Sequence, residues 1–375
     1  ILAGIISLDF LPINPDLTLL LVSSVLMSVV VGFLLESPKV ALLQFVLNVY
    51  IVFMTFGTLG WLGYGLSQES VLGLVVLMTL ITSNLVHVLS TLLREMARGL
   101  FQYDAVAEAI KLNASPIFLS NLTTALGFVF AAWLDSTYLP LAWLVVIGVS
   151  FSFLITISWL PMILLNWLLE FRVGNPTDRH GLTFLATWLQ NHTVYRKILI
   201  GFAILISAGL VVFNWSILKE LEQLFWLITV FIALFWLFWR SLSLALINLG
   251  INFLAILVSV SLFIVVTGES QWALLLWMVP LGLIVDDGIH FFSRYARAKY
   301  TVFSDAKSAT VFAMASVGRP IWITSWVLFS GLAVLLFSES GLVFHASLLT
   351  ILALVVATIL ILTVLPALLM SKNQK

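Results

Sequence analysis

LGLIVDDGIHFFSRY, residues 281–295, carries two adjacent carboxylates, Asp286 and Asp287, inside an apolar run that begins near Gln271. The run is long enough to cross a bilayer, where an ionised carboxylate is strongly destabilised, so acids at this depth usually have a function. Consecutive helical positions lie about 100° apart, so both side chains can face the interior of a helix bundle. Each charged carboxylate disfavours ionisation of the other. We predict that the pair binds and releases protons as a unit.

The surroundings of the acid pair support this prediction. The alternative is a structural ion pair or hydrogen-bond network that holds one of the acids, but no Lys or Arg lies in the middle of an apolar run to neutralise them. Gly282 lies four residues before Asp286 on the same helix face. Its missing side chain lets a neighbouring helix approach closely.

Composition places the chain outside the range of soluble domains. Of 375 residues, 62% are hydrophobic and 9% are charged, and the mean hydropathy is +1.16, which indicates a polytopic membrane protein. The absence of cysteine excludes disulfides and thiolate metal sites, and the net charge of zero argues against nucleic-acid binding. We expect no metal, no cofactor other than protons as coupling ion, and no enzyme activity. Because the first residue is Ile1 and not Met, we expect a missing N-terminus or a part of a longer protein.

Apolar runs of about twenty residues mark the expected membrane spans. Residues 1–11 look like a shortened first span, which gives about 12 spans in total. With this count every Lys and Arg except Lys219 falls on one side, which the positive-inside rule assigns to the cytoplasm. The full-length spans are expected at residues 17–35, 40–66, 71–92, 115–134, 139–168, 197–215, 222–240, 243–267, 271–293, 319–338 and 342–370.

The two halves of the sequence match each other at offsets of 203 to 205 residues. The match indicates a tandem duplication of a six-span unit, with both copies in one orientation. It rests on three pairs of segments: SNLVHVLSTLLREMARG (83–99) with DDGIHFFSRYARAKY (286–300), SPIFLSNLTTALGF (115–128) with RPIWITSWVLFSGL (319–332), and SWLPMILL (158–165) with LTVLPALL (362–369).

The duplication defines the expected domains. Residues 1–168 form the first repeat and residues 197–371 the second, with a polar cytoplasmic linker at 169–196. Two Ala-rich stretches with interspersed charges, 94–113 and 294–317, are expected to be amphipathic helices on the cytoplasmic surface, with solvated loops as the alternative.

The alignment places Ser83 and Asn84 opposite the two acids, so only the second half carries carboxylates. These two residues, and Thr82 before them, can hydrogen-bond the carboxylates across the interface between the halves. Thr324 and Ser325, on the span after the acids, can extend the same network. The alternative for every hydroxyl is a bond to the backbone of its own helix.

Two histidines occupy matching positions in the halves. His290 lies one turn after the acids, and its imidazole titrates in the range needed to pass protons inward. His87 has no acid beside it, which favours the alternative that both histidines are helix-packing residues at the interface. His345, near the outer end of the last span, is interpreted as structural.

This layout resembles the resistance–nodulation–division (RND) superfamily, and its details are most similar to the MMPL and sterol-sensing-domain-like branches. The resemblance rests on GLIVDDGIHFFSRY (282–295), the charged stretch that follows it, and SPIFLSN (115–121) and RPIWITS (319–325). It implies twelve spans in two repeats, with large extracytoplasmic domains after the first and seventh spans. It also implies an exporter in the bacterial inner membrane, driven by protons that bind acids on the central helices.

The sequence departs from this pattern in two ways. Only short segments, 11–16 and 215–222, occupy the places of the large domains, which we expect were removed or left out unless this is a natural minimal version. Relatives in the MMPL branch usually carry an acid in both halves, and the drug-efflux branch has a central Lys that is missing here. The resemblance implies a lipid or other hydrophobic substrate, with multidrug efflux as an alternative. A periplasmic partner or a homo-oligomer is also expected.

Two other classes of protein can place acids in a membrane. A non-transporting sensor or scaffold for a sterol-like or hopanoid-like lipid needs no proton site, although the acid-free first half is compatible with it. An intramembrane aspartyl protease carries its two acids on separate, facing helices, whereas Asp286 and Asp287 are neighbours on one helix.

Overall fold

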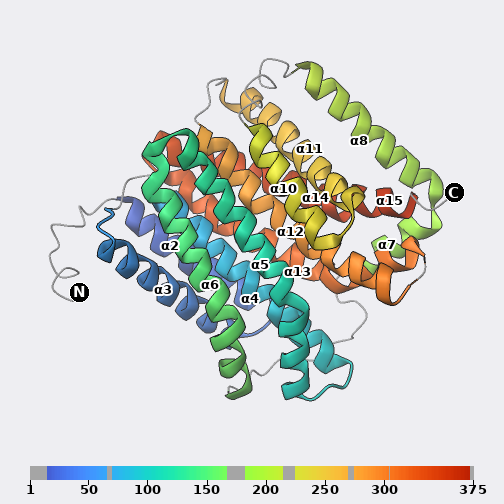
Figure 1. The fold of residues 1–375 in the computed structure, drawn as a ribbon, viewed down its shortest axis with the longest axis horizontal. Helices are drawn as coiled ribbons and strands as arrows, with labels where there is room; N and C mark the ends of the chain where they lie inside the picture. Colours follow the sequence, from blue (N-terminus) through green and yellow to red (C-terminus); the bar gives the residue numbers. More distant parts are fainter. Residues whose placement is uncertain are drawn as a thin grey trace.

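A computed structural model describes residues 15–65, 70–166, 182–213, 224–268, 274–303 and 305–371. In these residues the chain forms helices with two short 3-10 turns and no strand (Figure 1). The all-helical class predicted from the sequence is confirmed. The expected remnant at 1–11 and residues 169–181 of the expected linker lie outside the described residues.

The first half of the described chain forms helices that follow the apolar runs of the sequence. A short helix, α7 (Leu182–Asn191), lies within the expected linker. The long helices are α2 (Pro15–Leu34), α3 (Pro38–Trp61), α4 (Ser70–Ala97), α5 (Gln102–Leu134) and α6 (Leu139–Asn166).

The second half follows the same pattern, and its last expected span is divided. Helix α14 (Gly341–Leu362) ends where Pro366 cannot donate a backbone hydrogen bond to the carbonyl of Leu362, and α15 (Val364–Ser371) continues after this break. The remaining helices are α8 (Thr193–Phe213), α10 (Phe225–Trp239), α11 (Leu242–Thr267), α12 (Leu274–Thr301) and α13 (Ala306–Val334).

Several of these helices can cross a bilayer. Within the described residues, eight helices are long and apolar enough to do so, and two shorter apolar helices lie at 18–34 and 225–239. The chain is therefore a multi-pass membrane protein.

The two stretches expected as separate amphipathic helices are instead the ends of long helices, so that prediction is wrong. Residues 94–97 end α4, and 102–113 begin α5. In the second half, residues 294–301 end α12, and 306–317 begin α13.

Prolines inside α5 and α13 explain this difference. Proline lacks a backbone N–H and disfavours helix at the residue before it, so Pro116 and Pro320 suggest helix starts. Both lie inside continuous helices. Pro320 leaves the carbonyl of Ser316 without its helical donor, and the guanidinium of Arg94 on α4 donates to this oxygen at 3.3 Å. A neighbouring helix thus satisfies the freed group, as is common in membrane proteins.

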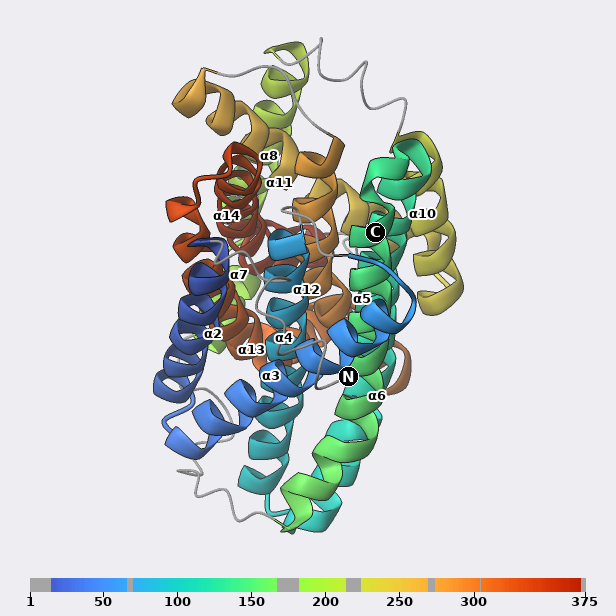
Figure 2. The same cartoon turned by 90° about the vertical axis from the view of Figure 1, so that its left-hand side faces the viewer.

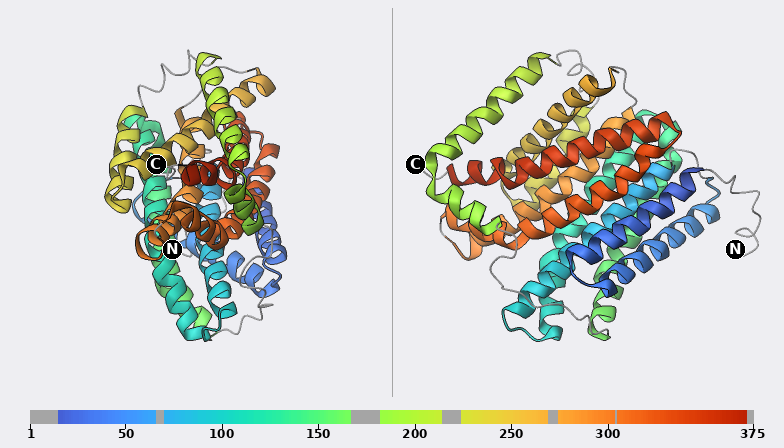
Figure 3. Two further views of the ribbon diagram at one scale, coloured as in Figure 1. Left: turned by 90° about the vertical axis from the view of Figure 1, so that its right-hand side faces the viewer. Right: turned by 180° about the vertical axis from the view of Figure 1, so that it is seen from behind.

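Helices α4 and α12 lie in the middle of the bundle. Figure 2 shows them between α2, α13 and α14 on one side and α5, α6 and α10 on the other. Every residue of the most apolar window of α4 is buried, compared with 6% of the corresponding window of α8, which runs along the outer edge (Figure 3). The sequence therefore places its polar membrane residues where other helices, and not lipid, surround them.

Helices of each half pack against helices of the other half. Helix α12 lies against α5 of the other half, and α13 lies against α2 and α4. The acid-bearing helix and its counterpart α4 are thereby held at one interface, which positions the candidate site.

Candidate functional site

Helix α12 carries both acids into the interior of the bundle. Asp286 and Asp287 are each 3% exposed. Because successive helical positions diverge by about 100°, the two carboxylates contact different helices. Asp286 meets Ser83 on α4, and Asp287 meets Thr324 on α13.

Asp286 binds across the interface between the halves through one of its two oxygens. The Ser83 hydroxyl donates to Oδ2 at 2.6 Å, which is a short, charge-assisted distance. The other oxygen, Oδ1, lies 3.5 Å from Nε2 of His290 and has no hydrogen-bond partner among the described residues. The carboxyl group thus has one satisfied oxygen and one that is free to accept a proton.

Asp287 has a weaker partner. The Thr324 hydroxyl lies 3.3 Å from Oδ1, but it also lies 3.0 Å from the carbonyl of Pro320 and 2.9 Å from that of Ile321. A hydroxyl has one proton to donate. If Thr324 donates to its own helix, it can only accept from Asp287, and this requires a protonated carboxyl group.

Three of the predicted supporting residues bond elsewhere. The Asn84 amide donates to Ser152 at 3.0 Å and to Asn121 at 3.4 Å, both within the first half. Thr82 accepts from Gln44 at 2.8 Å. Ser325 shares a hydrogen bond of 2.7 Å with Thr358. The predicted contact of Thr82 and Asn84 with the carboxylates is therefore wrong, and Ser325, expected to extend the network, contacts Thr358 instead. The hydroxyls of Thr82 and Ser325 also donate to carbonyls of their own helices, which was the alternative for each hydroxyl.

Gly282 lies against Thr124 of α5, but the prediction that its missing side chain is needed for close helix approach is not borne out. The Thr124 hydroxyl of α5 donates to the Gly282 carbonyl at 2.9 Å. A methyl group added at Gly282 would lie 3.4 Å from the Thr124 side chain, an ordinary contact distance. This backbone bond ties the acid-bearing helix to the other half of the chain.

Sequence reasoning missed a tighter contact at Gly288. A Cβ atom at this position would lie 2.2 Å from Oδ1 of Asn248 on α11 and 3.5 Å from the Asn252 amide. Both asparagines are buried. The signal was present in the sequence, because Asn248 and Asn252 interrupt an apolar run four residues apart and align with Gln44 and Asn48 of the first half.

His87 and His290 stack against each other between α4 and α12. Their ring centroids lie 3.6 Å apart and the planes differ by 5°. Each residue is 1% exposed. Nε2 of His87 and both ring nitrogens of His290 have no hydrogen-bond partner among the described residues. The sequence placed these residues at matching positions, and the structure brings them into direct contact.

The histidines and Asp286 also form a group with the ligand types of a metal site. One nitrogen of each ring and one carboxylate oxygen lie within 4.8 Å of one another. A metal ion must lie in the plane of each imidazole that binds it, along the nitrogen lone pair. Two stacked, nearly parallel planes share no such point, so the observed ring orientation does not fit chelation of one ion by both histidines.

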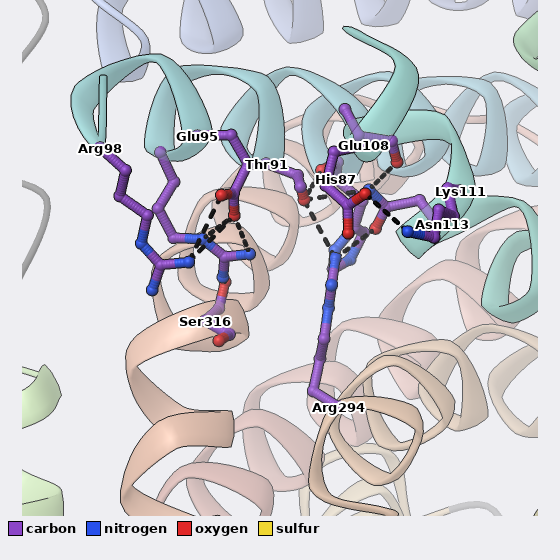
Figure 4. A network of polar contacts seen from close by, with 11 residues as sticks. His87, Thr91, Glu95, Arg98, Glu108, Lys111, Asn113, Arg294 and Ser316 are labelled. Atoms are coloured by element: carbon purple, nitrogen blue, oxygen red, sulfur yellow. Dashed lines mark hydrogen bonds and ion pairs between the residues drawn. The ribbon is translucent and has the colours of Figure 1, made fainter. Parts of the chain in front are cut away.

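A buried arginine lies one turn beyond His290 on α12. Arg294 donates to Thr91 on α4 and to Asn113 on α5, each at 3.1 Å (Figure 4). The Thr91 hydroxyl donates in turn to the backbone carbonyl of His87, at 2.9 Å. The histidine stack is therefore bounded by the acids on one side and by a guanidinium on the other.

The half of the chain that holds the acids matches a known protein family. Residues 219–374 match the model of the MMPL family. This segment contains Asp286, Asp287 and His290. The predicted resemblance to the RND superfamily and its MMPL branch is confirmed. No curated protein matches the sequence.

Two solved structures share the fold. One is SecDF, a translocon-associated membrane protein from Thermus thermophilus, with a TM-score of 0.73 and 14% identity over 96% of this chain and 63% of that chain. The other is SecDF in a super-membrane-facing form, with a TM-score of 0.70 and 13% identity over 95% of this chain and 61% of that chain. The chain thus spans less than two thirds of their length, and identities this low show the fold alone.

Proposed function

We propose that this chain is the membrane part of an RND-type exporter that moves a lipid or other hydrophobic substrate and is driven by protons binding at Asp286 and Asp287. Its place is the bacterial inner membrane. It contains about 12 spans arranged as two six-helix repeats, which rock against each other. Its role is transport, without enzyme activity and without a cofactor other than protons.

The observation that carries this proposal is the buried contact between Asp286 and Ser83. It joins the two halves at 2.6 Å, with both residues nearly inaccessible to solvent. Among the ion pairs of the described residues, neither carboxylate is paired with Lys or Arg. An ionised pair in such surroundings requires water or a rearrangement, whereas a protonated pair is compatible with a dry interface. Protonation therefore biases how closely the halves pack.

The packing of the helices supports the two-repeat arrangement. Helix α5 lies against α12 and α10, whereas α13, its counterpart by sequence matching, lies against α4 and α2. Because α12 corresponds to α4 and α10 to α2 by the same sequence matching, α5 and α13 each contact the equivalent helices of the other half. An arrangement of this kind is expected of two copies related by an axis along the membrane normal.

The choice of a hydrophobic substrate rests on the family match and on the apolar surroundings of the site. Helix α8, for example, exposes Phe202 by 61% and Leu205 by 71%, as expected for contact with lipid tails. Residues 214–223, the second expected position of a large extracytoplasmic domain, lie outside the described residues. The substrate class is therefore proposed from the match to the MMPL family and not from a binding pocket.

Proton flux into vesicles tests the proposal. The purified chain is reconstituted into liposomes that contain the pH indicator pyranine and a fluorescent phospholipid, and a membrane potential is imposed with valinomycin and potassium. Asp286→Asn combined with Asp287→Asn should lower proton entry and lipid movement by about 100-fold, because both proton-binding groups are lost. Asp135→Asn, an exposed acid in a short connection, is the matched control.

Each outcome distinguishes transport from the lipid-sensor alternative. A sensor would bind the fluorescent phospholipid equally well in the double variant and the wild type, with no potential-dependent proton entry in either. Unchanged proton-driven lipid movement in the double variant would instead reject the acid pair as the coupling site.

A further inference from the structure

The stacked histidines are the only titratable contact of Asp286 in the described part of the chain apart from its neighbour Asp287. Oδ2 of Asp286 accepts from Ser83, so an added proton is expected on Oδ1. Nε2 of His290 lies 3.5 Å from this atom, within a small side-chain adjustment of a hydrogen bond. Neither atom has another hydrogen-bond partner among the described residues.

The ring of His290 can both accept and release a proton. A neutral imidazole carries its hydrogen on one nitrogen and a lone pair on the other. Both ring nitrogens of His290 lack a partner in the described residues, so either tautomer is available without breaking a bond. A proton that arrives at Nε2 from Asp286 can therefore leave from Nδ1, which leaves the ring neutral with its hydrogen on Nε2.

Stacking limits the histidine pair to one positive charge. A cationic imidazole is stabilised by the π face of a neutral neighbour, and the rings of His87 and His290 lie at a suitable centroid separation of 3.6 Å. A second proton would place like charges face to face in a low-dielectric interior. Arg294, one helical turn farther along α12, adds a fixed positive charge that also opposes double protonation.

Other charges lie at the ends of the neighbouring helices. Helices α6 and α11 carry no charged side chain, and α14 carries only His345 as a titratable group. The remaining charged groups on the helices packed against α4 and α12 are Asp16 on α2, Lys39 on α3, Arg94 and Glu95 on α4, Asp104, Glu108 and Lys111 on α5, Arg297 and Lys299 on α12, and Lys307 and Arg319 on α13, with Tyr side chains at 50, 103, 295 and 300.

We propose that His290 accepts the proton from Asp286 and that His87, by stacking against it, holds the cation so that the pair passes one proton at a time toward the cytoplasmic side. This inference rests on the proposed function and extends it. In the step, the O–H bond of Asp286 breaks and an N–H bond forms at Nε2 of His290, which leaves a carboxylate and an imidazolium. The imidazolium then gives its Nδ1 proton to water near the end of the helix that holds Arg294. His290 takes part in the transfer, and His87 is a positioning residue.

The direct test follows ring protonation in the full chain, in lipid nanodiscs with ¹⁵N-labelled histidine. The chain has only five histidines, so signals can be assigned with single variants. Between about pH 8 and pH 4 the pair should take up one proton in total, and the second ring should remain neutral. Two neutral rings throughout this range, or two cationic rings, would overturn the proposal.

Proton entry into pyranine-containing liposomes supplies the second test. His290→Gln should lower the rate by about 100-fold, and His87→Gln by about tenfold, because the second variant keeps the acceptor and loses only the stacked ring. His345→Gln, on the last long helix, should match the wild type. Full flux in His290→Gln, with flux lost in Asp286→Asn combined with Asp287→Asn, rejects the relay and leaves the proposed function intact. Full flux in both rejects the proposed function as well.

Added zinc tests the remaining alternative use of the same side chains. The parallel rings predict that one equivalent of zinc leaves the ¹⁵N signals of His87 and His290 unchanged. Zinc binding that shifts both signals together, and that is lost in Asp286→Asn, would replace the relay by a metal site. Variants of the other three histidines, His180, His192 and His345, leave the two remaining signals to this pair, so these measurements hold even if His290→Gln fails to fold.

Discussion

Helices α4 and α12 lie at the same interface, and α4 carries neutral residues at the positions aligned with the acids and with Arg294 of α12. Asn84 on α4 donates to Asn121 and Ser152, which are neutral partners in its own half. The acids on α12 have one hydroxyl contact each. The aligned pairs are Ser83 with Asp286, Asn84 with Asp287, His87 with His290, and Thr91 with Arg294.

This comparison shows how one geometry can support two roles. Ser83 and Asn84 keep the same charge at any pH near neutrality, so Ser83 can serve as a fixed donor to Asp286. The ionisable side chains of α12 can change charge while they are held against it. A duplicated bundle therefore does not need acids in both copies, provided that the neutral copy supplies donors at the interface, as Ser83 does.

The largest effect is expected from substituting each of the two acids singly. Asp286→Asn should lower proton entry into liposomes by about 100-fold, because Asp286 contacts both Ser83 and His290. Asp287→Asn should lower it by about tenfold, because its only described side-chain partner is the shared hydroxyl of Thr324. The pyranine assay measures both rates, with Asp135→Asn as control. Equal losses would show that the acids act as one unit without the distinction drawn from their contacts.

The second effect concerns how closely α12 approaches its neighbour. Gly288→Ala should lower the free energy of unfolding by about 1–3 kcal/mol, because the new methyl group would lie 2.2 Å from Oδ1 of Asn248. Combining it with Asn248→Ala should recover much of this loss. The aligned residue on α4 is Leu85, which is buried.

Unfolding in detergent with increasing SDS provides the measurement. Gly127→Ala is the matched control, because nothing lies within 4 Å of a Cβ atom at this position. Alanine there should be neutral or stabilising by up to about 1 kcal/mol through helix propensity. If Gly288→Ala behaves like Gly127→Ala, the close contact at Asn248 is not a restriction.

The third prediction compares Ser83 and Asn84 on α4. Ser83→Ala should lower proton entry by about tenfold, since it removes a hydrogen bond to a carboxylate. Asn84→Ala should change the rate less than twofold or so, because Asn84 contacts Asn121 and Ser152 and not the acids. Proton entry measured at matched protein density checks both. A larger loss in Asn84→Ala than in Ser83→Ala would contradict the observed contacts.

Much of the fold follows from the sequence because apolar runs and helix length are both set by the bilayer. The buried position of the acids was predictable from the same reasoning, since a carboxylate in lipid is unstable. The extent of α13 was not, because the carbonyl freed by Pro320 finds its donor in Arg94, more than two hundred residues away.

The contacts of the candidate site were predictable only in part. Sequence matching placed Ser83 and Asn84 opposite the acids, but the direction of each side chain depends on how the helices of the two halves pack against each other. Ser83 therefore reaches Asp286 while Asn84 turns toward Ser152. The stacking of His87 on His290 has the same origin: alignment gives equal positions, and only the crossing of α4 and α12 gives contact.

The smallest effect compares the starts of α5 and α13, which align in sequence. The carboxylate of Asp305 accepts from the backbone N–H of Ser308 at 2.8 Å, which caps α13, whereas Phe101 begins α5 without a side-chain cap. Asp305→Ala should lower the free energy of unfolding by about 0.5–1 kcal/mol, and Phe101→Asp should raise it by a similar amount. Thermal unfolding in detergent measures both changes.

The pH dependence gives this prediction its sign. The hydrogen bond from the Ser308 N–H lowers the pKa of Asp305 below its ordinary value. Since the folded state holds the ionised form, the stabilisation is fully present above the unfolded pKa of about 3.9 and is lost as the pH falls through the folded value. The difference between wild type and Asp305→Ala should therefore be full at neutral pH and should shrink in acid. A difference that persists after the carboxyl group is protonated would mean that Asp305 stabilises α13 by something other than its charge-assisted cap.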